Sequence, residues 1–506
     1  MASQIDSTNN HQPLTPAERV WGQPNLRGMR GFLPLVAPYV VLGEFADLND
    51  LLNAMPVITK AGQAGLLAEN KLRQACDQLK DHTPSIQALI HTLNSQDPTE
   101  AEKDSLAQDL VMLFRDYQYL KMGYLFESVH HGDASASPKL PSNIAQPLVL
   151  LADVFQQKPW LEYASGYVLV NSQFQQVITA DKVNLIRQWH GGRDEFYFQT
   201  VHSIIEWETP ELFAAIADVI EAVESANELQ ITAGMRQGIA ITRKMLAGLK
   251  QMTKLSRPAY YSSDVRPQIQ GLVGNCGEGK LFPEAGVYFE AQSLAANQES
   301  GVYINDIRGQ TGAQSSIIPL LDNFLGITDF YAPGHNPLTN MLREFRYYRP
   351  RPHTALLELV ESEHKRLNLR HTLKNKVPLL LAEWTQVVAQ FREFHFFLAM
   401  AYIVKPGKAA PKTQSRAVGT GGSPTPSYLP QHVKESLEAL ADSLSMVDVA
   451  QLSPQEQQLV HSLHDYLAQT FIANDERSKV VGDYLAGKKT QSELEESVDS
   501  TETAVQ

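Results

Sequence analysis

Apolar residues in this chain recur with the spacing of an α-helix, and this period constrains the fold more than any other feature. The clearest run is VPLLLAEWTQVVAQFREFHFFLAMAYIV (377–404), which ends where Lys405-Pro406-Gly407 breaks the pattern. By i, i+4 and i+7 spacing, one face of that helix carries Phe391, His395, Leu398 and Tyr402. Residues 209–230 show the same period behind a Thr-Pro-Glu start that favours a helix N-terminus. Strand-like alternation is scarce, so we predict an all-α fold.

The length and the low-complexity segments suggest how the helices are grouped. A chain of 506 residues, 43% of them hydrophobic, can build two packed units. We predict a flexible arm over 1–27, a smaller N-terminal helical domain over 28–180 and a larger helical domain over 181–485. A segment rich in Pro, Gly, Ser and Lys is expected to form a mobile loop over 405–430. The polar end of the chain, 486–506, is expected to be a disordered tail.

Charge and cysteine content argue against several classes of protein. The net charge of −13 disfavours non-specific nucleic-acid binding. The sequence contains no run of eighteen or more apolar residues, so we predict no transmembrane helix. The polar N-terminus lacks the apolar core of a signal peptide. The two cysteines, Cys76 and Cys276, fit a reducing compartment and cannot form a disulfide scaffold, a Cys-rich zinc site or an iron–sulfur cluster. We therefore expect a cytoplasmic protein without a membrane partner.

Two short motifs look functional at first sight but lack the context that their chemistry needs. GNCGEGK (274–280) has the spacing of a phosphate-binding loop, but Leu281 stands where a magnesium-binding Ser or Thr belongs, and no apolar strand precedes it. HSLH (461–464) has no third or fourth zinc ligand that can be named. We interpret the first as a glycine-rich turn and the second as a solvated helix face. The same holds for the scattered pairs His130/His131 and His364/His371.

His395 lies inside the dense aromatic stripe of 377–404, and its two ring nitrogens need partners or a ligand. A core histidine that is bonded to a carbonyl group is the ordinary alternative. A second apolar helix, within RGQTGAQSSIIPLLDNFLGI (308–327), carries a single charge, Asp322. Arg392 precedes His395 by three residues, so we predict an ion pair between Asp322 and Arg392 that joins the two helices. This pair could be purely structural.

Six segments, taken in order, resemble the indoleamine 2,3-dioxygenase family. The likeness extends over about residues 25 to 485 and implies an all-α protein with a small helical domain and a larger haem-binding catalytic domain. The six segments are LPSNIAQPLVLLADVF (140–155), RPQIQGLVG (266–274) with GVYFEA after it, RGQTGAQSSIIPLLDNFLGI (308–327), FRYYRPRPHTALL (345–357), FREFHFFLAMAYIV (391–404) and GTGG (419–422).

The resemblance implies that His395 is the proximal ligand of a b-type haem iron. A neutral imidazole in an apolar pocket can bind iron through one nitrogen and donate a hydrogen bond from the other. Arg392 would lie beside the haem, pair with Asp322 and face a propionate. Thr311 and Gly312, in the glycine- and serine-rich turn, are further candidate cofactor-binding residues.

Other family positions imply an indole site. Arg266 matches the arginine that binds the substrate carboxylate, for which a planar guanidinium suits bidentate contact; a surface arginine is the alternative. Thr420, followed by Gly421, matches the loop threonine that contacts the substrate amino group, and glycines on both sides would let the loop close. A plain flexible linker is the alternative there. Phe198 matches a distal aromatic residue that packs on the indole ring.

The chain departs from the family pattern at two positions. His202 falls where animal indoleamine dioxygenases have serine, whereas the related tryptophan 2,3-dioxygenases place a distal histidine that meets the indole N–H. His202 could therefore contact the substrate, bind iron as a sixth ligand, or do neither if the alignment is wrong by one turn. Tyr261, or Tyr260, stands near a family phenylalanine, where a hydroxyl group would add a polar contact and alter substrate choice.

The reaction implied is insertion of both atoms of O₂ across the indole C2–C3 bond of L-tryptophan, or of a related indoleamine, to give N-formylkynurenine in the kynurenine pathway of tryptophan catabolism. The resemblance also implies an external reductant and a monomer. Two alternatives remain. One is a haem enzyme of the same fold that acts on a different indole, and the other is a non-catalytic haem-binding sensor or store.

Overall fold

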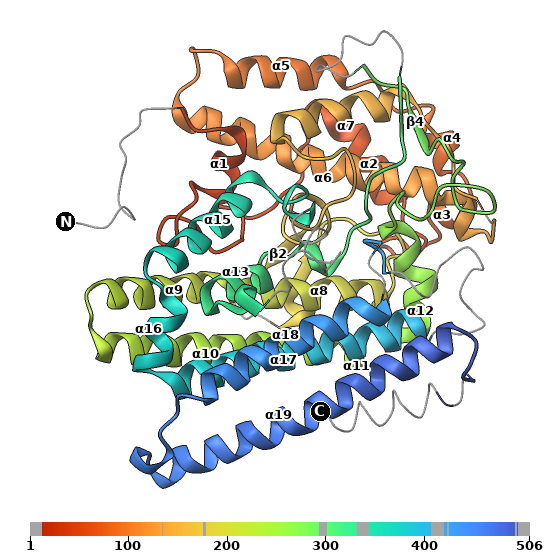
Figure 1. Ribbon diagram of the computed structural model, residues 1–506. Coiled ribbons are helices and arrows are strands. Elements are labelled where there is room, and N and C mark those ends of the chain that lie inside the picture. The colour runs from red at the N-terminus through yellow and green to blue at the C-terminus, as the bar shows by residue number, and fades with distance from the viewer. Residues whose placement is uncertain are drawn as a thin grey trace.

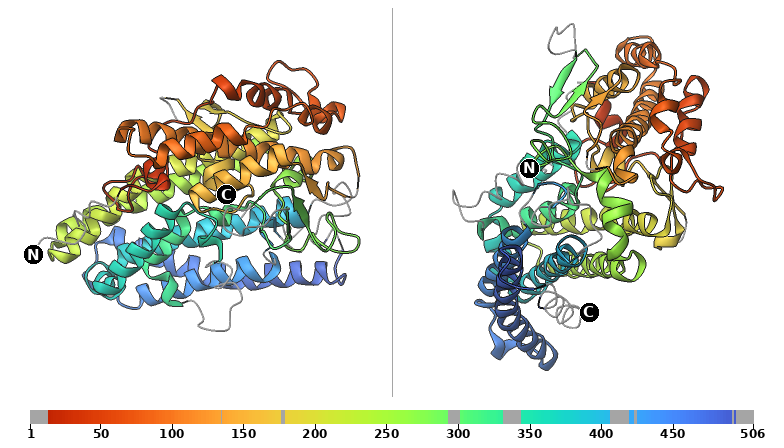
Figure 2. Two further views of the ribbon diagram at one scale, coloured as in Figure 1. Left: turned by 90° about the horizontal axis from the view of Figure 1, so that it is seen from above. Right: turned by 90° about the vertical axis from the view of Figure 1, so that its right-hand side faces the viewer.

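Helices dominate the computed structural model, which confirms the all-α prediction (Figure 1). The structure describes residues 13–133, 135–175, 179–292, 301–330, 344–405, 419–422, 425–490 and 493, the side chains of 425–428 excepted. Its helices form two groups that pack against each other, as the views in Figures 1 and 2 show.

The first group surrounds the long helix α6 (Glu100–His130). A capping box starts this helix, because Thr99 accepts a hydrogen bond from the Glu102 N–H and the Glu102 side chain bonds back to Thr99. The other helices of the group are α1 (Pro16–Trp21), α2 (Ala46–Ala54), α3 (Leu66–Glu69), α4 (Leu72–Cys76), α5 (Thr83–Asn94) and α7 (Ser142–Phe155).

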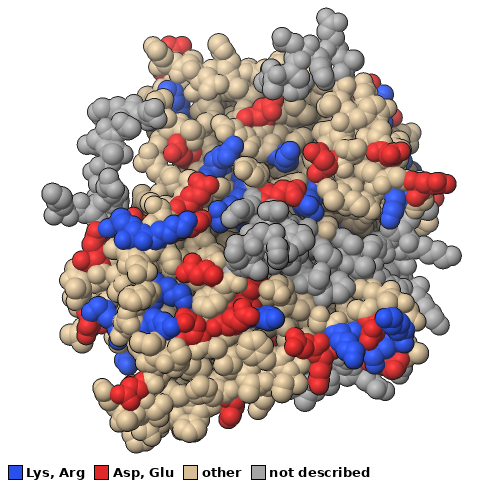
Figure 3. All heavy atoms as spheres, in the orientation of Figure 1, with Lys and Arg blue, Asp and Glu red and all other residues tan. Residues whose placement is uncertain are grey.

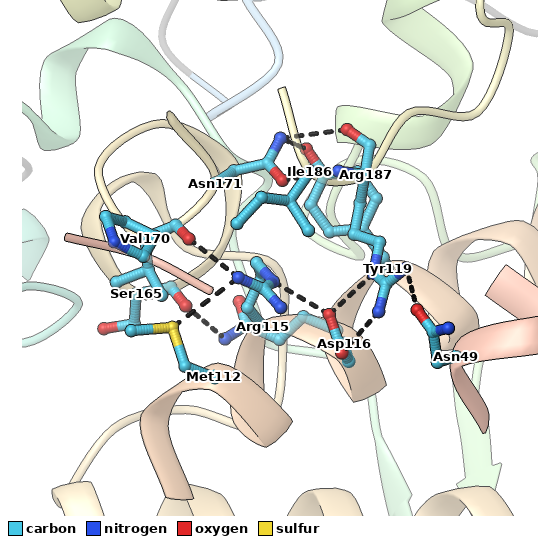
Figure 4. A network of polar contacts seen from close by, with 12 residues as sticks. Asn49, Met112, Arg115, Asp116, Tyr119, Ser165, Val170, Asn171, Ile186 and Arg187 are labelled. Atoms are coloured by element: carbon cyan, nitrogen blue, oxygen red, sulfur yellow. Dashed lines mark hydrogen bonds and ion pairs between the residues drawn. The ribbon is translucent and has the colours of Figure 1, made fainter. Parts of the chain in front are cut away.

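Two buried charges on α6, Arg115 and Asp116, are paired with each other and with Arg187 in the chain that leads to the second group. Asp116 receives Arg115 Nε at 2.8 Å and Arg187 Nη2 at 2.8 Å, and Figure 4 shows both guanidinium groups directed at its carboxylate. Asn171 extends the network, since its Nδ2 donates to the Arg187 carbonyl at 2.9 Å and to Gln199 Oε1 at 3.0 Å. Gln199 belongs to α8 (Arg193–Trp207), so the network joins the two groups of helices.

The second group contains α8 and the remaining helices. They are α9 (Thr209–Glu224), α10 (Glu228–Lys250), α11 (Met252–Leu255), α12 (Pro258–Tyr260), α13 (Ile317–Leu325), α15 (Arg351–Arg366), α16 (Leu369–Lys376), α17 (Pro378–Ala399), α18 (Thr425–Leu444) and α19 (Pro454–Leu485). Short 3₁₀ or π turns at Tyr163–Tyr167, Tyr261–Val265, Arg266–Ile269, Gly312–Gln314 and Met400–Val404 shape the region near the cavities described below.

Helix α17 packs against α10 and α18. Gly238 of α10 permits the approach, because an added Cβ there would lie 1.9 Å from Cη2 of Trp384. Trp384 Nε1 in turn donates to Thr242 Oγ1 at 2.9 Å, which fixes the register between the two helices. The helix predicted over 377–404 is thus confirmed, with a π turn in its last five residues.

Five short strands were not predicted. The pair β4 (Val287–Phe289) and β5 (Val302–Ile304) is antiparallel, with Tyr288 opposite Tyr303, and β1 (Lys139–Leu140) joins β4 in parallel. A second pair consists of β2 (Ser172–Phe174) and β3 (Val183–Leu185). Strands of two or three residues are too short to show a period of two in the sequence.

The predicted arm over 1–27 is wrong in its second half. Helix α1 starts with a capping box between Thr15 and Glu18, and Trp21 is 1% exposed. Arg19 binds Glu100 and Asp104, each at 2.6 Å. Burial of the apolar residues of so short a segment depends on α6 and α15, which the sequence places far away. Residues 1–12 lie outside the described residues.

The second predicted boundary that differs is the end of the loop over 405–430. Helix α18 begins at Thr425, because Pro426 is tolerated in a first helical turn and Pro430 lies inside the helix. Residues 406–418 and 423–424 of the predicted loop, and 491–492 and 494–506 of the predicted tail, lie outside the described residues. One hydrophobic cluster extends from Ala17 to Val481. The division at residue 180 stays a prediction.

By length and composition alone, Pro378–Val404 could cross a membrane, the one helix among the described residues that passes this test. In the folded chain, 78% of its apolar window is buried by the surrounding helices. On the face shown in Figure 3, acidic and basic side chains are intermixed.

Candidate functional site

Two adjoining cavities lie where α8, α13, α17 and α18 meet. His202 of α8 and His395 of α17 line both cavities, so these two side chains stand at the boundary between them. The first cavity extends toward Asp322 and Arg392, and the second toward Phe198, Tyr261 and Thr420. The walls that both share are completed by Leu249, Gly312, Ala313 and Leu429.

The His395 ring faces these cavities without a hydrogen bond to any other described residue. Burial, together with the nearby rings of His202 and His432, lowers its pKa to about 4. The imidazole is therefore neutral at physiological pH. This geometry argues against the core histidine bonded to a carbonyl group, because such a residue would have a partner in the apo fold.

The predicted pair between Arg392 and Asp322 is confirmed. Arg392 Nη2 lies 2.5 Å from Asp322 Oδ2, which joins α17 to α13, and both residues line the first cavity. Arg392 Nη1 also donates to Ser436 Oγ at 2.5 Å and to the His432 carbonyl at 3.3 Å. The guanidinium is thereby held at the cavity wall by partners on two other helices, α13 and α18.

Hydrogen bonding assigns the tautomer of His202. Its Nδ1 donates to the Phe198 carbonyl at 2.7 Å, so Nε2 carries the lone pair. Burial lowers the pKa of this ring, which keeps it neutral. A Cβ built on Gly312 would lie 3.8 Å from Nε2, so the small glycine leaves room beside the unprotonated nitrogen.

Aromatic side chains form one wall of the second cavity. The ring of Phe198 lies 5.1 Å from that of His202 and 5.0 Å from that of Tyr261, and Tyr261 lies 5.7 Å from Tyr402. Tyr261 is 4% exposed, whereas Tyr260 is 43% exposed and points away. Of the two candidate tyrosines, Tyr261 is therefore the cavity residue. Burial raises its pKa to about 12, so its hydroxyl stays protonated.

The GTGG segment packs on the turn before α13. Thr420 and Thr311 both line the second cavity. A Cβ on Gly309 would lie 2.4 Å from the Thr420 carbonyl oxygen, and one on Gly421 would lie 2.8 Å from Thr311 Cγ2. Arg308 Nη1 donates to the Gly421 carbonyl at 3.0 Å. Gly421 thus permits the close approach of the two segments and does not itself line a cavity.

Arg266 is buried, at 4% exposure, which rules out the alternative of a surface arginine. Burial lowers its pKa, and Tyr261 lies close enough to raise it. Arg266 is not among the residues that line either cavity, although it directly follows the π turn that carries Tyr261. Its role in binding a substrate carboxylate stays a prediction.

Several cavity residues were not predicted. Tyr163 and Ser315 line the first cavity beside Glu206, whose Oε1 accepts a hydrogen bond from Ser315 Oγ at 2.7 Å. Burial raises the pKa of Glu206 to about 7. His432 of α18 lines the same cavity and pairs with Glu435 at 2.9 Å. The sequence analysis missed His432 because the predicted loop covered the start of α18. The side of α18 that carries His432 was therefore not identified.

These features fit a haem. The first cavity supplies a neutral imidazole without a partner at one end and a fixed guanidinium at its wall, while Ile205, Leu249, Ile317 and Phe391 give it apolar sides. His395 would bind the iron and Arg392 would face a propionate.

Comparison with known proteins agrees with this geometry. The family model for indoleamine 2,3-dioxygenase matches residues 25–442. The chain belongs to the indoleamine 2,3-dioxygenase family. As a member of it, the protein is a haem-dependent dioxygenase of the indoleamine type, which uses O₂ and an indole.

Similarity to individual family members is modest. The chain is 26% identical to indoleamine 2,3-dioxygenase acdA of Aspergillus candidus, over 57% of this chain and 71% of that relative. It is also 26% identical to 6-hydroxytryptophan 2,3-dioxygenase fscD of Fusarium equiseti, over 63% and 77% respectively. A myoglobin of Haliotis madaka is 24% identical, over 58% and 71%. The proteins that this chain resembles thus carry different names, one of which names 6-hydroxytryptophan.

Proposed function

We propose that this indoleamine dioxygenase inserts both atoms of O₂ across the C2–C3 bond of L-tryptophan and forms N-formylkynurenine. The observation that carries the proposal is the adjacency of two cavities that share His202 and His395. One has the features of a haem site, and the other has an aromatic wall and a hydroxyl-bearing loop. Reactants held side by side in this way lose little further entropy on reacting.

Residues of the first cavity would hold the cofactor. His395 would bind the iron through its unpartnered ring, and Arg392, held by Asp322 and Ser436, would face a propionate. Apolar side chains exclude water from the porphyrin. When bound, the haem supplies the oxygen-activating chemistry that no side chain provides.

Residues of the second cavity would hold the indole. Phe198 and Tyr261 offer aromatic surface to the ring, and the lone pair of His202 Nε2 accepts a hydrogen bond from the indole N–H. This assignment follows from the tautomer, because Nδ1 is already committed to the Phe198 carbonyl. Thr420 contacts the substrate amino group, and Arg266 pairs with the carboxylate if the π turn that carries Tyr261 adjusts on binding.

The test is an absorption spectrum of the haem-reconstituted protein in the ferric, ferrous and ferrous-CO states, with and without L-tryptophan, followed by assay for N-formylkynurenine with a chemical reductant. We expect a Soret band that shifts with CO and again with L-tryptophan, and formation of the product. A parallel assay with 6-hydroxytryptophan checks the substrate, because one relative is named for that compound. Turnover of 6-hydroxytryptophan alone would contradict the choice of L-tryptophan.

A second candidate function is haem binding without turnover of an indole. Two relatives named myoglobin favour it, and so does the position of His202 beside the same cavity as His395, from where it could bind iron as a sixth ligand. A six-coordinate low-spin ferrous spectrum that is indifferent to CO and L-tryptophan would support this function over the first.

We also propose that the protein works as a monomer in the cytosol with an external reductant. Cys76 and Cys276 are both free, as a reducing compartment would leave them.

A further inference from the structure

Helix α19 (Pro454–Leu485) lies beyond residue 442, where the family match ends, yet it packs along α17 and α18 (Figure 1). A capping box between Ser453 and Glu456 starts it. Leu463 is fully buried against Ala382 of α17 and Leu440 of α18. This helix is therefore an integral part of the fold, although the family match does not extend to it.

The polar contact between α19 and α17 is buried and specific. Arg477 Nη1 lies 2.7 Å from Glu393 Oε1, and the Tyr466 hydroxyl donates to Glu393 Oε2 at 3.4 Å. Arg477 and Glu393 are 8% and 6% exposed. Asn474 Nδ2 also donates to the carbonyl of Pro430, at the start of α18, at 3.1 Å. Both oxygens of the Glu393 carboxylate are thus held by α19.

Glu393 stands opposite His395 on α17. Two residues along an α-helix correspond to a rotation of about 200°, so one side chain faces away from the cavity when the other faces into it. Arg392, between them, is fixed by Asp322 and Ser436. The contacts of α19 with Glu393 therefore restrain rotation of α17. They act on the face of α17 that points away from the cavities, which the cavity residues do not contact.

We propose that α19 sets the rotational position of the haem-ligand helix, with Arg477 and Tyr466 as positioning residues that act on His395 through Glu393. The inference rests on the proposed ligation of haem by His395. Arg477 holds the back of α17, so the His395 ring meets the iron at a defined angle and depth. Loss of the ion pair leaves a buried carboxylate unpaired, which favours a shifted helix.

The test compares Arg477→Met, Arg477→Lys and Lys479→Met in the full-length holoprotein. Lys479 lies on the same helix but is exposed, so it serves as the matched control. Two measurements are made: the rate of haem transfer to excess apomyoglobin, and the iron–histidine stretching band of the ferrous protein by resonance Raman. We expect Arg477→Met to lose haem roughly tenfold faster and to shift the band, Arg477→Lys to restore most of both, and Lys479→Met to match the wild type.

Folded Arg477→Met with the wild-type transfer rate and band would overturn the inference. If Arg477→Met does not fold, the double variant Glu393→Gln/Arg477→Met takes its place in both measurements, because it also removes the unpaired charge of Glu393. In the double variant a shifted band supports the inference, and a wild-type band overturns it. Failure of the wild-type protein to take up haem would instead overturn the proposed function, so the two failures are distinguishable.

Discussion

At the scale of single residues, His202 and His395 show how hydrogen bonding gives two identical side chains different binding properties. Both are neutral because burial lowers their pKa values. His202 Nδ1 donates a hydrogen bond to the Phe198 carbonyl, whereas the His395 ring has no hydrogen-bond partner among the described residues. The first is therefore suited to accept a hydrogen bond, and the second to bind a metal.

We expect His395→Ala to abolish stable haem binding, because it removes the imidazole that we propose as the iron ligand from the wall of the first cavity. The ratio of Soret to protein absorbance after reconstitution measures this. His461→Ala is the control, since His461 is exposed on α19. Full haem content in His395→Ala would contradict the assignment.

Arg266→Ala should raise the KM for L-tryptophan while leaving haem content unchanged, because it removes the proposed carboxylate partner without touching the first cavity. Steady-state kinetics on the reconstituted enzyme test this. The exposed Arg236 provides the control variant Arg236→Ala. An unchanged KM would show that the substrate carboxylate is bound elsewhere.

Glu206 should make stability depend on pH. Burial raises its pKa from 4.5 to about 7, so its contribution to stability is full below pH 4.5 and is lost as the pH rises through 7. Glu206→Gln keeps the group neutral, and its free energy of unfolding should therefore fall less over this interval than that of the wild type. Urea unfolding across the interval measures this, with the exposed Glu476→Gln as control. Equal slopes would be inconsistent with a protonated Glu206.

At the scale of elements, the position of α17 depends on close contacts on two of its sides. Gly238 of α10 brings α17 close on one side, and α18 and α19 cover the other. The 3.6-residue period predicted each helix separately. The period did not predict these contacts. It shows which face of a helix is apolar, but it does not show which other helix packs against that face.

Gly238→Ala should destabilise the protein by ~1–3 kcal/mol, because its new Cβ would overlap the Trp384 ring. Gly482→Ala in α19 is the matched control. Nothing lies within 4 Å of a Cβ there, so the better helix former should raise stability by up to ~1 kcal/mol. Denaturant midpoints of both variants decide the matter. A neutral Gly238→Ala would mean that α10 and α17 separate at little cost.

At the scale of the whole molecule, the polar network drawn in Figure 4 continues from Asn171 to α8 and so joins the two groups of helices. Asp116 of α6 balances Arg115 and Arg187, and Asn171 passes the network on to Gln199 of α8, next to Phe198. Helix α8, which carries Phe198 and His202, is therefore tied to the first group by this network, although it belongs to the second group together with α17.

Asp116→Asn should cost ~3–5 kcal/mol of unfolding free energy, because it leaves two buried guanidinium groups without a counter-charge. Asp218→Asn is the control, since the pair of Asp218 with Arg27 is roughly half exposed and should contribute no more than ~1 kcal/mol. Urea unfolding of both variants provides the test. Similar losses in the two would show that the central network is not a major source of stability.

Local chemistry in the sequence was sufficient to predict the helices, the aromatic stripe around His395 and the pair of Arg392 with Asp322, since helical period and lone buried charges act over a few residues or require a counter-charge. Only the tertiary structure decided that α1 is docked and that α19 contacts the side of α17 that faces away from the cavities. It also decided that His432 lines the first cavity, that Glu206 accepts a hydrogen bond from Ser315 beside it, and that Tyr261 and not Tyr260 lines the second cavity. Each of these depends on which helix faces pack against each other although they are far apart in the sequence. The burial, hydrogen-bond partners and pKa values of the side chains follow from that packing.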